Sequence, residues 1–194
     1  MSVAFERIWA MPSRWTFTIK PIKQLLDRYV GSGMMINGLW CDPFAGENSP
    51  AQETNDLNPA RPTKFHMPAI DFLKTYPDNH FDGVLFDPPY SPRQVKECYD
   101  SIGLALSQAD TQQTFWAACK DEIARILKPD GIAISFGWNS QGVGASRGFD
   151  KLEILLVPHG GNKNDTIVTV ETKKRSSQRL ATTKKPPQRK GERL

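Results

Sequence analysis

The sequence predicts an α/β fold, a Rossmann-like sandwich built on a mostly parallel seven-stranded sheet with an antiparallel C-terminal hairpin. Three observations support this prediction. Short apolar runs alternate with segments of helical periodicity, an order typical of parallel sheets. Two of these runs end at an aspartate followed by proline. The last two apolar runs are joined by a loop rich in glycine and asparagine, which favours a hairpin.

The first half of the chain contains one helix and three strands by these criteria. Residues 21–30 place apolar side chains at helical spacing, with Pro21 suited to the first turn and glycines 31 and 33 after the end. Residues 34–46 indicate a buried strand that opens into a glycine turn, and a short second strand ends at Asp56. Residues 64–74 indicate a third strand followed by a helical turn.

The second half contains the clearest strand. Residues 81–86 are an apolar run that must end at Asp87, because the two prolines that follow cannot continue a central strand. The remaining predicted elements are a helix over 112–127, a turn over 128–131, a strand over 131–140 and a hairpin over 151–172. Ligands bind beyond the carboxyl ends of such strands, where we expect Asp42, Asp56 and Asp87.

Composition indicates one globular domain over residues 1–172. Of the 194 residues, 39% are hydrophobic, which is ordinary for a chain that buries a core. There is neither an apolar run long enough to cross a membrane nor a signal peptide, so we expect a cytoplasmic protein without a membrane partner. The three cysteines and three histidines have no ligand spacing, so we expect free thiols and no metal.

Basic residues concentrate at the C-terminal end. Residues 173–194 carry nine lysines and arginines against one acid, a net charge of +8, which leaves −4 of the total +4 for residues 1–172. This segment lacks hydrophobic periodicity, so we expect a disordered tail that either solubilises the chain or binds nucleic-acid phosphates. The residues expected to contact nucleic acid are Lys173, Lys174, Arg175, Lys184, Lys185, Arg189 and Lys190.

The segment Asp87-Pro88-Pro89-Tyr90 carries the strongest chemical signal. An exocyclic amine of a nucleobase is a weak nucleophile, and it needs hydrogen-bond acceptors that hold it against an electrophilic methyl group. The Asp87 carboxylate and the Pro88 carbonyl supply two acceptors side by side, and Tyr90 offers a face on which an extruded base can stack.

This segment resembles the catalytic motif of the S-adenosylmethionine-dependent adenine-N6 and cytosine-N4 methyltransferases, which reads Asp/Asn/Ser-Pro-Pro-aromatic. The resemblance covers about residues 15–172 and implies the class I methyltransferase sandwich, with S-adenosylmethionine as cofactor. Upstream, residues 40–48 resemble the cofactor loop of the same enzymes through Asp42, Pro43, Phe44, Ala45 and Gly46. The second glycine of that loop is Asn48 here, a residue that tolerates a left-handed conformation.

The resemblance also implies further site residues. An acid at the end of the second strand holds the cofactor ribose, a place taken by Asp56 with Leu57 beside it, although a capping role for Asp56 remains an alternative. Weaker candidates are Thr18 and Lys20 from the segment before the cofactor loop. Ala69, Ile70 and Asp71 are candidates for the cofactor adenine, and Trp138 and Asn139 join Tyr90 as candidates for the target-base pocket.

We therefore expect methyl transfer to the N6 amine of adenine in DNA. Cytosine N4 and adenine in RNA remain alternatives, because both present an equivalent amine, and a protein glutamine amide ranks lower. A non-catalytic nucleic-acid-binding protein on the same fold is the alternative from another class. The short spacing between the two motifs leaves no room for a recognition domain, as in small stand-alone enzymes of phages. The sequence does not indicate an oligomeric state.

Overall fold

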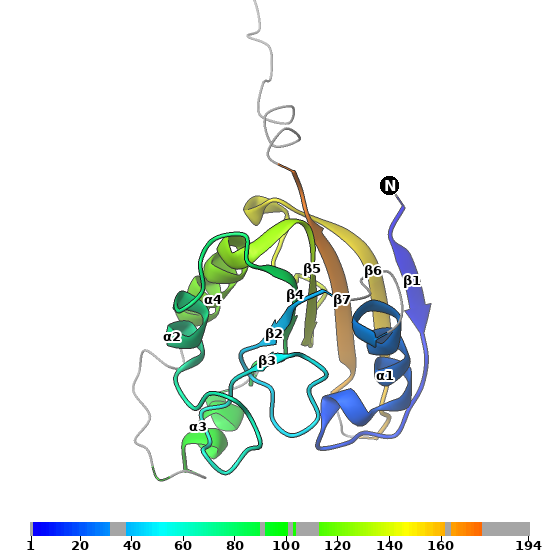
Figure 1. The fold of residues 1–194 in the computed structure, drawn as a ribbon. Helices are drawn as coiled ribbons and strands as arrows, with labels where there is room; N and C mark the ends of the chain where they lie inside the picture. The colour runs from blue at the N-terminus through cyan, green and yellow to red at the C-terminus, as the bar shows by residue number, and fades with distance from the viewer. Residues whose placement is uncertain are drawn as a thin grey trace, which may run out of the picture.

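The protein forms a single layered α/β unit around one twisted sheet (Figure 1). The computed structural model describes residues 2–31, 38–89, 92–100, 103, 113–161 and 164–175. Among these residues, no helix has the length and apolar character needed to cross a membrane.

The sheet has seven strands in the order β1-β6-β7-β5-β4-β2-β3. β7 is antiparallel to β5 and β6, and every other neighbouring pair is parallel. The predicted α/β class, the mostly parallel sheet and the antiparallel hairpin are thus confirmed. The strands are β1 (Ala4–Arg7), β2 (Trp40–Asp42), β3 (Glu53–Thr54), β4 (Phe81–Phe86), β5 (Leu127–Gly137), β6 (Phe149–Val157) and β7 (Thr166–Lys173).

The number of strands is as predicted, but one member differs. The expected strand at residues 64–67 is reduced to an isolated bridge between Phe65 and Asn55. The seventh strand is β1 instead. It lies at the sheet edge beside β6, and the sequence did not indicate it. The predicted turn at 128–131 lies inside β5 as a bulge. Phe81 pairs with Leu127 and Gly83 with Ile132, so the four residues between bulge out, with Asp130 at φ 64°.

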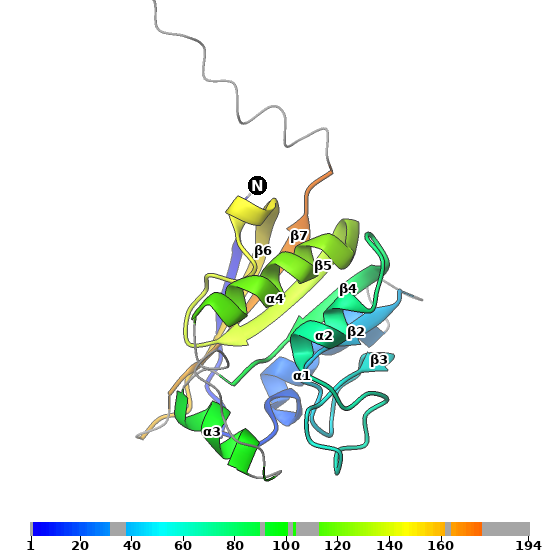
Figure 2. The ribbon, with the colours of Figure 1, turned by 90° about the vertical axis from the view of Figure 1, so that its left-hand side faces the viewer.

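Helices cover both faces of the sheet (Figures 1 and 2). α1 (Lys20–Leu26), which continues as a π-helical turn over Asp27–Gly31, lies on one face, and its Pro21 occupies the first turn as expected. α2 (Ala69–Lys74) and α4 (Gln113–Ile126) lie side by side on the other face. α3 (Pro92–Asp100), which we did not predict, follows the double proline after β4.

The core consists of two apolar clusters, one on each face of the sheet. The α1 side contains Ile22 and Leu25 with Leu85, Ile134 and Val168 of the sheet, and the α2–α4 side contains other residues of the same strands. Strand alternation produces this division, since neighbouring residues of β5 point to opposite faces. Gly83 of β4 is required by the packing, because a Cβ there would lie 2.3 Å from the Trp40 indole of β2.

The basic C-terminal segment begins later than predicted. Lys173 is the last residue of β7, and Lys174 pairs with Asp150 at 2.8 Å. Arg175 pairs with Asp130 at 2.6 Å. These three residues belong to the folded unit, because the chain carries them past Asp150 of β6 and Asp130 in the bulge of β5. The other candidate tail residues, Lys184, Lys185, Arg189 and Lys190, lie outside the described residues.

Candidate active site

A cavity of about 520 Å³ lies at the carboxyl ends of β2, β3 and β4. This is the edge at which parallel sheets bind ligands, and the volume lies within the range of small-molecule sites. The structure brings ten of the predicted site residues together in its lining: Pro43, Phe44, Ala45, Gly46, Asp56, Leu57, Ala69, Asp87, Pro88 and Pro89.

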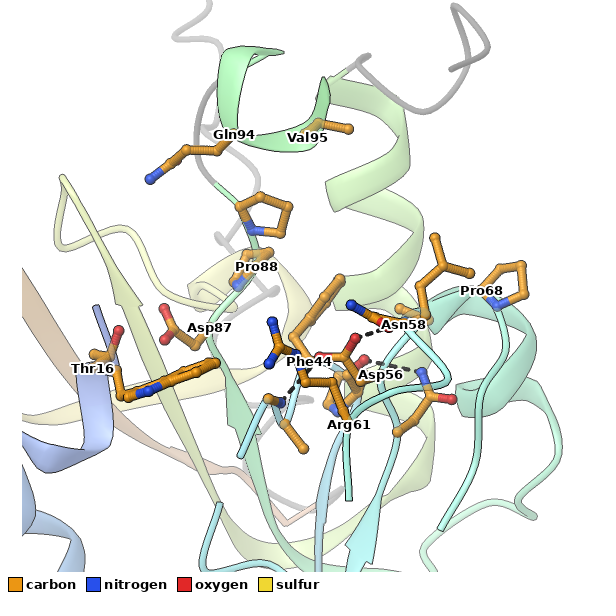
Figure 3. Close-up of a pocket in the computed structure, with 18 of the residues that line it drawn as sticks. Thr16, Phe44, Asp56, Asn58, Arg61, Pro68, Asp87, Pro88, Gln94 and Val95 are labelled. Atoms are coloured by element: carbon orange, nitrogen blue, oxygen red, sulfur yellow. Dashed lines mark hydrogen bonds between the residues drawn. The ribbon is translucent and has the colours of Figure 1, made fainter. Parts of the chain in front are cut away.

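Asp87 follows the last residue of β4 and faces the cavity (Figure 3). The strand ends there because Pro88 and Pro89 lack the N–H groups that a central strand donates. Figure 3 shows Asp87 between Thr16 on one side and Phe44 with Asp56 on the other, with Gln94 and Val95 of α3 above. The half-buried carboxylate of Asp87 is thus available to a ligand held across the cavity. Tyr90, the fourth residue of the predicted motif, lies outside the described residues.

Asn55, which the sequence did not single out, ties together the loops that form the cavity floor. Its buried side-chain amide donates to the carbonyl oxygens of Pro43 at 3.1 Å and Met67 at 2.9 Å, and its Oδ1 accepts from the Met67 N–H at 3.1 Å. Its main chain adds bonds to Asp42 and Ala45, each at 2.9 Å. One side chain therefore sets the spacing of three loops, a role with no motif to reveal it.

The turn after β2 approaches its neighbours closely at Gly46. This residue has φ 58°, and a Cβ on it would lie 3.2 Å from the Trp15 ring. Its N–H donates to Asp56 Oδ2 at 3.1 Å. Among the described non-glycine residues only Asn79 and Asp130 have positive φ, so Asn48, which lines the cavity, needs no left-handed conformation. The loss of the second glycine at position 48 is therefore compatible with this turn.

Asp56 joins the turns that follow β2 and β3. Besides its bond to Gly46, its Oδ1 accepts the N–H of Asn58 at 2.8 Å. The side chain also lines the cavity. No helix begins directly after Asp56 in the described chain, so it stabilises a turn rather than capping a helix, and its contact with a cofactor ribose stays a prediction.

Asp42 lies beneath the cavity rather than in its lining. It is fully buried and accepts hydrogen bonds from the Phe44 N–H at 2.9 Å and the Ser49 hydroxyl at 2.7 Å. Burial raises its pKa to about 7, and the negative charges of Asp87 and Asp56 act in the same direction. Asp42 thus shapes the turn and its electrostatic environment. Asp42 lies at the carboxyl end of β2 as expected, but its side chain bonds to the turn instead of lining the described cavity, and a contact with a cofactor stays a prediction.

Ala69 lines the cavity, but four other predicted cofactor residues do not. Thr18, Lys20, Ile70 and Asp71 are not part of the lining that the structure describes. The Thr18 hydroxyl donates to the Trp15 carbonyl oxygen at 2.8 Å and so caps the turn instead. Ile70 packs against the apolar cluster, and Asp71 is exposed in the first turn of α2. Helical periodicity turns both side chains of α2 away from the ligand edge.

Trp138 and Asn139, predicted for the target-base pocket, also lie away from the described lining of the cavity. Trp138 is exposed, and Asn139 accepts the N–H of Gln141 at 2.9 Å, which stabilises a turn after β5. The described lining therefore includes neither of these two predicted pocket residues.

Aromatic residues that the sequence did not single out form a wall of the cavity. Phe115 and Trp116 of α4 line it, and Trp116 contacts Phe44 edge to face at a ring distance of 5.9 Å. Trp15 also lines the cavity and stacks with the guanidinium groups of Arg14 and Arg61 at 4.8 and 4.9 Å. The segments RWTF (14–17) and QTFW (113–116) carry two aromatic residues each, which would have been a usable signal.

Among the described residues, no group of three or more histidine, cysteine, aspartate or glutamate side chains is arranged to hold a metal ion. The charged residues that line the cavity are Asp56, Asp87, Arg14 and Arg61, and the buried Asp42 lies beneath them. A lining that carries both signs of charge can hold a ligand with positive and negative groups.

Solved structures similar to this fold are methyltransferases. The 1,6-didemethyltoxoflavin-N1-methyltransferase of Burkholderia thailandensis, solved with 1,6-didemethyltoxoflavin and S-adenosylhomocysteine, matches with a TM-score of 0.56 and 13% identity over 80% of this chain and 78% of that one. The N-methyltransferase NodS of Bradyrhizobium japonicum WM9 matches with a TM-score of 0.52 and 10% identity over 80% and 96%. TrmN of Thermus thermophilus gives 0.54 and 15% over 82% of this chain and 50% of that chain.

These likenesses define the class of fold. The chain has the Rossmann-like sandwich of the class I methyltransferases, with the hairpin β6–β7 in the same sheet. No protein-family model and no curated protein matches the sequence. The particular activity therefore has to be inferred from the site.

Proposed function

We propose that this protein transfers the methyl group of S-adenosylmethionine to the exocyclic N6 amine of adenine in DNA. The observation that carries the proposal is the position of Asp87 and Pro88, side by side in the lining of one cavity with the turn at Gly46 and the acid Asp56. The two hydrogen-bond acceptors thus lie beside a space large enough for the cofactor, although Gly46 and Pro88 are 42 positions apart in the chain.

The charged residues of the cavity support this cofactor. S-adenosylmethionine carries a sulfonium cation and, on its methionine part, a carboxylate. Asp56 and Asp87 in the lining can face the cation, and Arg14 and Arg61 in the same lining can face the carboxylate. Glycine at position 46 and alanine at 45 keep the turn free of bulk, so a ligand can approach the main chain. Aromatic rings from Phe44 and Trp116 provide an apolar surface for an adenine ring.

The chemistry assigned to Asp87 and Pro88 is positioning and charge stabilisation. Bound S-adenosylmethionine supplies an electrophilic methyl group. The Asp87 carboxylate and the Pro88 carbonyl oxygen accept hydrogen bonds from the target amine, which directs its lone pair toward that methyl. As the N–C bond forms and the S–C bond breaks, positive charge develops on the amine, and the Asp87 carboxylate stabilises it. The amine then loses one proton, and S-adenosylhomocysteine leaves.

The nucleic-acid substrate is supported by the motif and by charge. Tyr90 is proposed to stack on an extruded base, and the basic segment after Arg175 is proposed to attract phosphates. Deleting residues 176–194 keeps the ion pairs of Lys174 and Arg175. We expect this deletion to weaken DNA binding and reduce its salt dependence, measured by fluorescence anisotropy at several salt concentrations. Unchanged affinity and slope would assign the segment a solubilising role.

Cytosine N4 and adenine in RNA are the second candidates, because each presents the same kind of amine to Asp87 and Pro88. A comparison of DNA and RNA substrates followed by nucleoside analysis separates them. The non-catalytic alternative predicts tail-dependent DNA binding without affinity for S-adenosylmethionine, which calorimetry tests directly. Cytoplasmic location is part of the proposal and follows from the proposed substrate.

The decisive variant is Asp87→Asn, which keeps the shape of the side chain but removes its charge. We expect methyl transfer to fall at least about 100-fold, while affinity for S-adenosylmethionine changes much less. Asp150→Asn is the matched control, because Asp150 pairs with Lys174 at the surface, away from the described cavity lining. Full activity of Asp87→Asn would contradict the proposal.

A further inference from the structure

The edge strand β1 has an exposure pattern unlike the rest of the molecule. Among the described residues, six large hydrophobic side chains are exposed, and five of them lie between positions 3 and 11. We call these five the β1 patch: Val3, Phe5, Ile8, Trp9 and Met11, with exposed fractions of 42%, 63%, 41%, 59% and 69%. Single exposed apolar residues are ordinary, but a contiguous set marks an interaction surface.

The main chain of this segment also has one unpaired side. The N–H groups of Ile8 and Ala10 donate to Leu156 and Pro158 at 3.0 and 3.2 Å, so the extended pairing with β6 continues past the end of β1. Because main-chain groups alternate along a strand, those of Phe5, Arg7 and Trp9 point away from β6. β1 is the last strand of the described sheet, so this side offers hydrogen bonds to another strand.

The patch continues onto one face of the sheet. Phe5 is paired with Ile154, and both Ile154 and Leu156 are half-buried on the face opposite Leu155 and Val157, which pack toward α1. Between β5 and β6 the chain forms only the three-residue η4 (Ala145–Arg147), so this connection provides no long helix to cover that face. Apolar surface therefore extends from the edge strand onto its neighbour.

We propose that the β1 patch is the interface of a homodimer in which β1 pairs antiparallel with β1 of a second copy. If each of the five side chains loses on the order of 100 Å² of exposed surface, the pair buries about 1,000 Å² in total, the size at which specific interfaces begin. A two-fold axis uses the same edge on both copies and leaves neither open. Nucleic acid is a poor occupant, because Glu6 and Arg7 give the strand no net charge.

Charge excludes two registers of this pairing. A two-fold axis perpendicular to the sheet places one residue opposite its own copy. An axis at Glu6 or at Arg7 would bring like charges together, which destabilises strand pairs. An axis at Ile8 avoids both contacts and sets each Trp9 opposite an Arg7 and each Met11 opposite a Phe5, so the β1 patch of each copy lies in the paired region. The two cavities then open in opposite directions, because the strands of the two copies run in opposite directions.

The test is the molar mass of the full chain, measured by light scattering from about 1 to 200 µM. We expect a dimer, and Phe5→Lys should raise its dissociation constant at least about 10-fold, because it places an ammonium group against the Met11 side chain of the second copy. Trp138→Lys is the matched control, since Trp138 is the sixth exposed large hydrophobic residue, with an exposed fraction of 45%, and lies outside the patch. Its dissociation constant should equal that of the parent chain. Circular dichroism of both variants verifies the fold.

Three results would overturn the proposal. One is a parent chain that stays monomeric over the whole concentration range. Another is a dimer that Phe5→Lys leaves intact, which would place the interface elsewhere. A third is a monomeric parent whose DNA affinity falls on Phe5→Lys more than on Trp138→Lys, which would assign the patch to nucleic acid. None of these results bears on Asp87, so the dimer and the proposed methyl transfer succeed or fail separately.

Discussion

The two halves of the sheet are built in different ways. β2 and β3 have only three and two residues, and the loops that follow them are held by side chains such as Asn55 and Asp56. β5, β6 and β7 have 11, 9 and 8 residues and are joined by long antiparallel ladders. The candidate site lies in the first half. The comparison suggests that main-chain pairing stabilises one half, whereas a few polar side chains shape the ligand site in the other.

The largest expected effect is at Asn55. Asn55→Ala leaves the buried carbonyl of Pro43 and the half-buried N–H and carbonyl of Met67 without their partner, at a cost on the order of 3 kcal/mol in the free energy of unfolding. Because the three loops lose their common link, we also expect affinity for S-adenosylmethionine to fall more than 10-fold. Denaturant unfolding and calorimetry measure the two effects.

Glu171 provides the matched residue in the other half. This buried carboxylate on β7 accepts the N–H groups of Val143 at 2.6 Å and Gly144 at 3.2 Å. Glu171→Gln should destabilise the fold by about 1–2 kcal/mol while cofactor affinity stays within a factor of two. If both variants lowered affinity in proportion to stability, the division between the two halves would be wrong.

The next prediction concerns Trp15, which lines the cavity. The ring contacts the turn at Gly46 and stacks with two arginines, so Trp15→Ala should open the cavity and weaken cofactor binding about 10-fold. Trp138→Ala removes an exposed tryptophan that does not line the described cavity and should leave this affinity unchanged. Titration calorimetry of both variants gives the comparison, and equal losses would mean that Trp15 has no specific role.

The smallest effect concerns pH. The pKa of Asp42 is raised to about 7 from the usual 3.8, so between about pH 4 and 7 the folded chain binds more protons than the unfolded one. The stability contributed by the protonated group is therefore present at low pH and lost as pH rises through 7. Asp42→Asn should flatten this part of the profile of unfolding free energy against pH. An unchanged slope would show that Asp42 is ionised in the folded chain below pH 7.

The parts of the fold that the sequence revealed are those with strong local signals. Residues 81–86 predicted β4 with its observed bounds, because an apolar run followed by two prolines has one interpretation. β1 was not predicted, because its residues are exposed and the strand forms only by pairing with β6. The paired residues Ala4 and Glu153 are 149 positions apart in the chain. Local pattern carries no information on such a contact.

The same distinction applies to the site. The sequence revealed Phe44, Gly46 and Asp87, because neighbouring residues determine the turn or the strand end at which each lies. Asp42 was expected at the cavity, but its side chain accepts hydrogen bonds from the turn that follows it. The motif does not reveal this side-chain conformation. Trp116 lies in the predicted helix over 112–127 but was not singled out, because its position in the cavity wall depends on tertiary packing beside Phe44.

The central claim is tested most directly by incubating the full chain with methyl-labelled S-adenosylmethionine and unmodified DNA, followed by nucleoside mass spectrometry. The account predicts labelled N6-methyladenine from the parent chain and from Asp150→Asn, and a loss of at least about 100-fold with Asp87→Asn. Absence of label from every nucleoside of DNA, while calorimetry shows that S-adenosylmethionine binds, would contradict the proposed substrate.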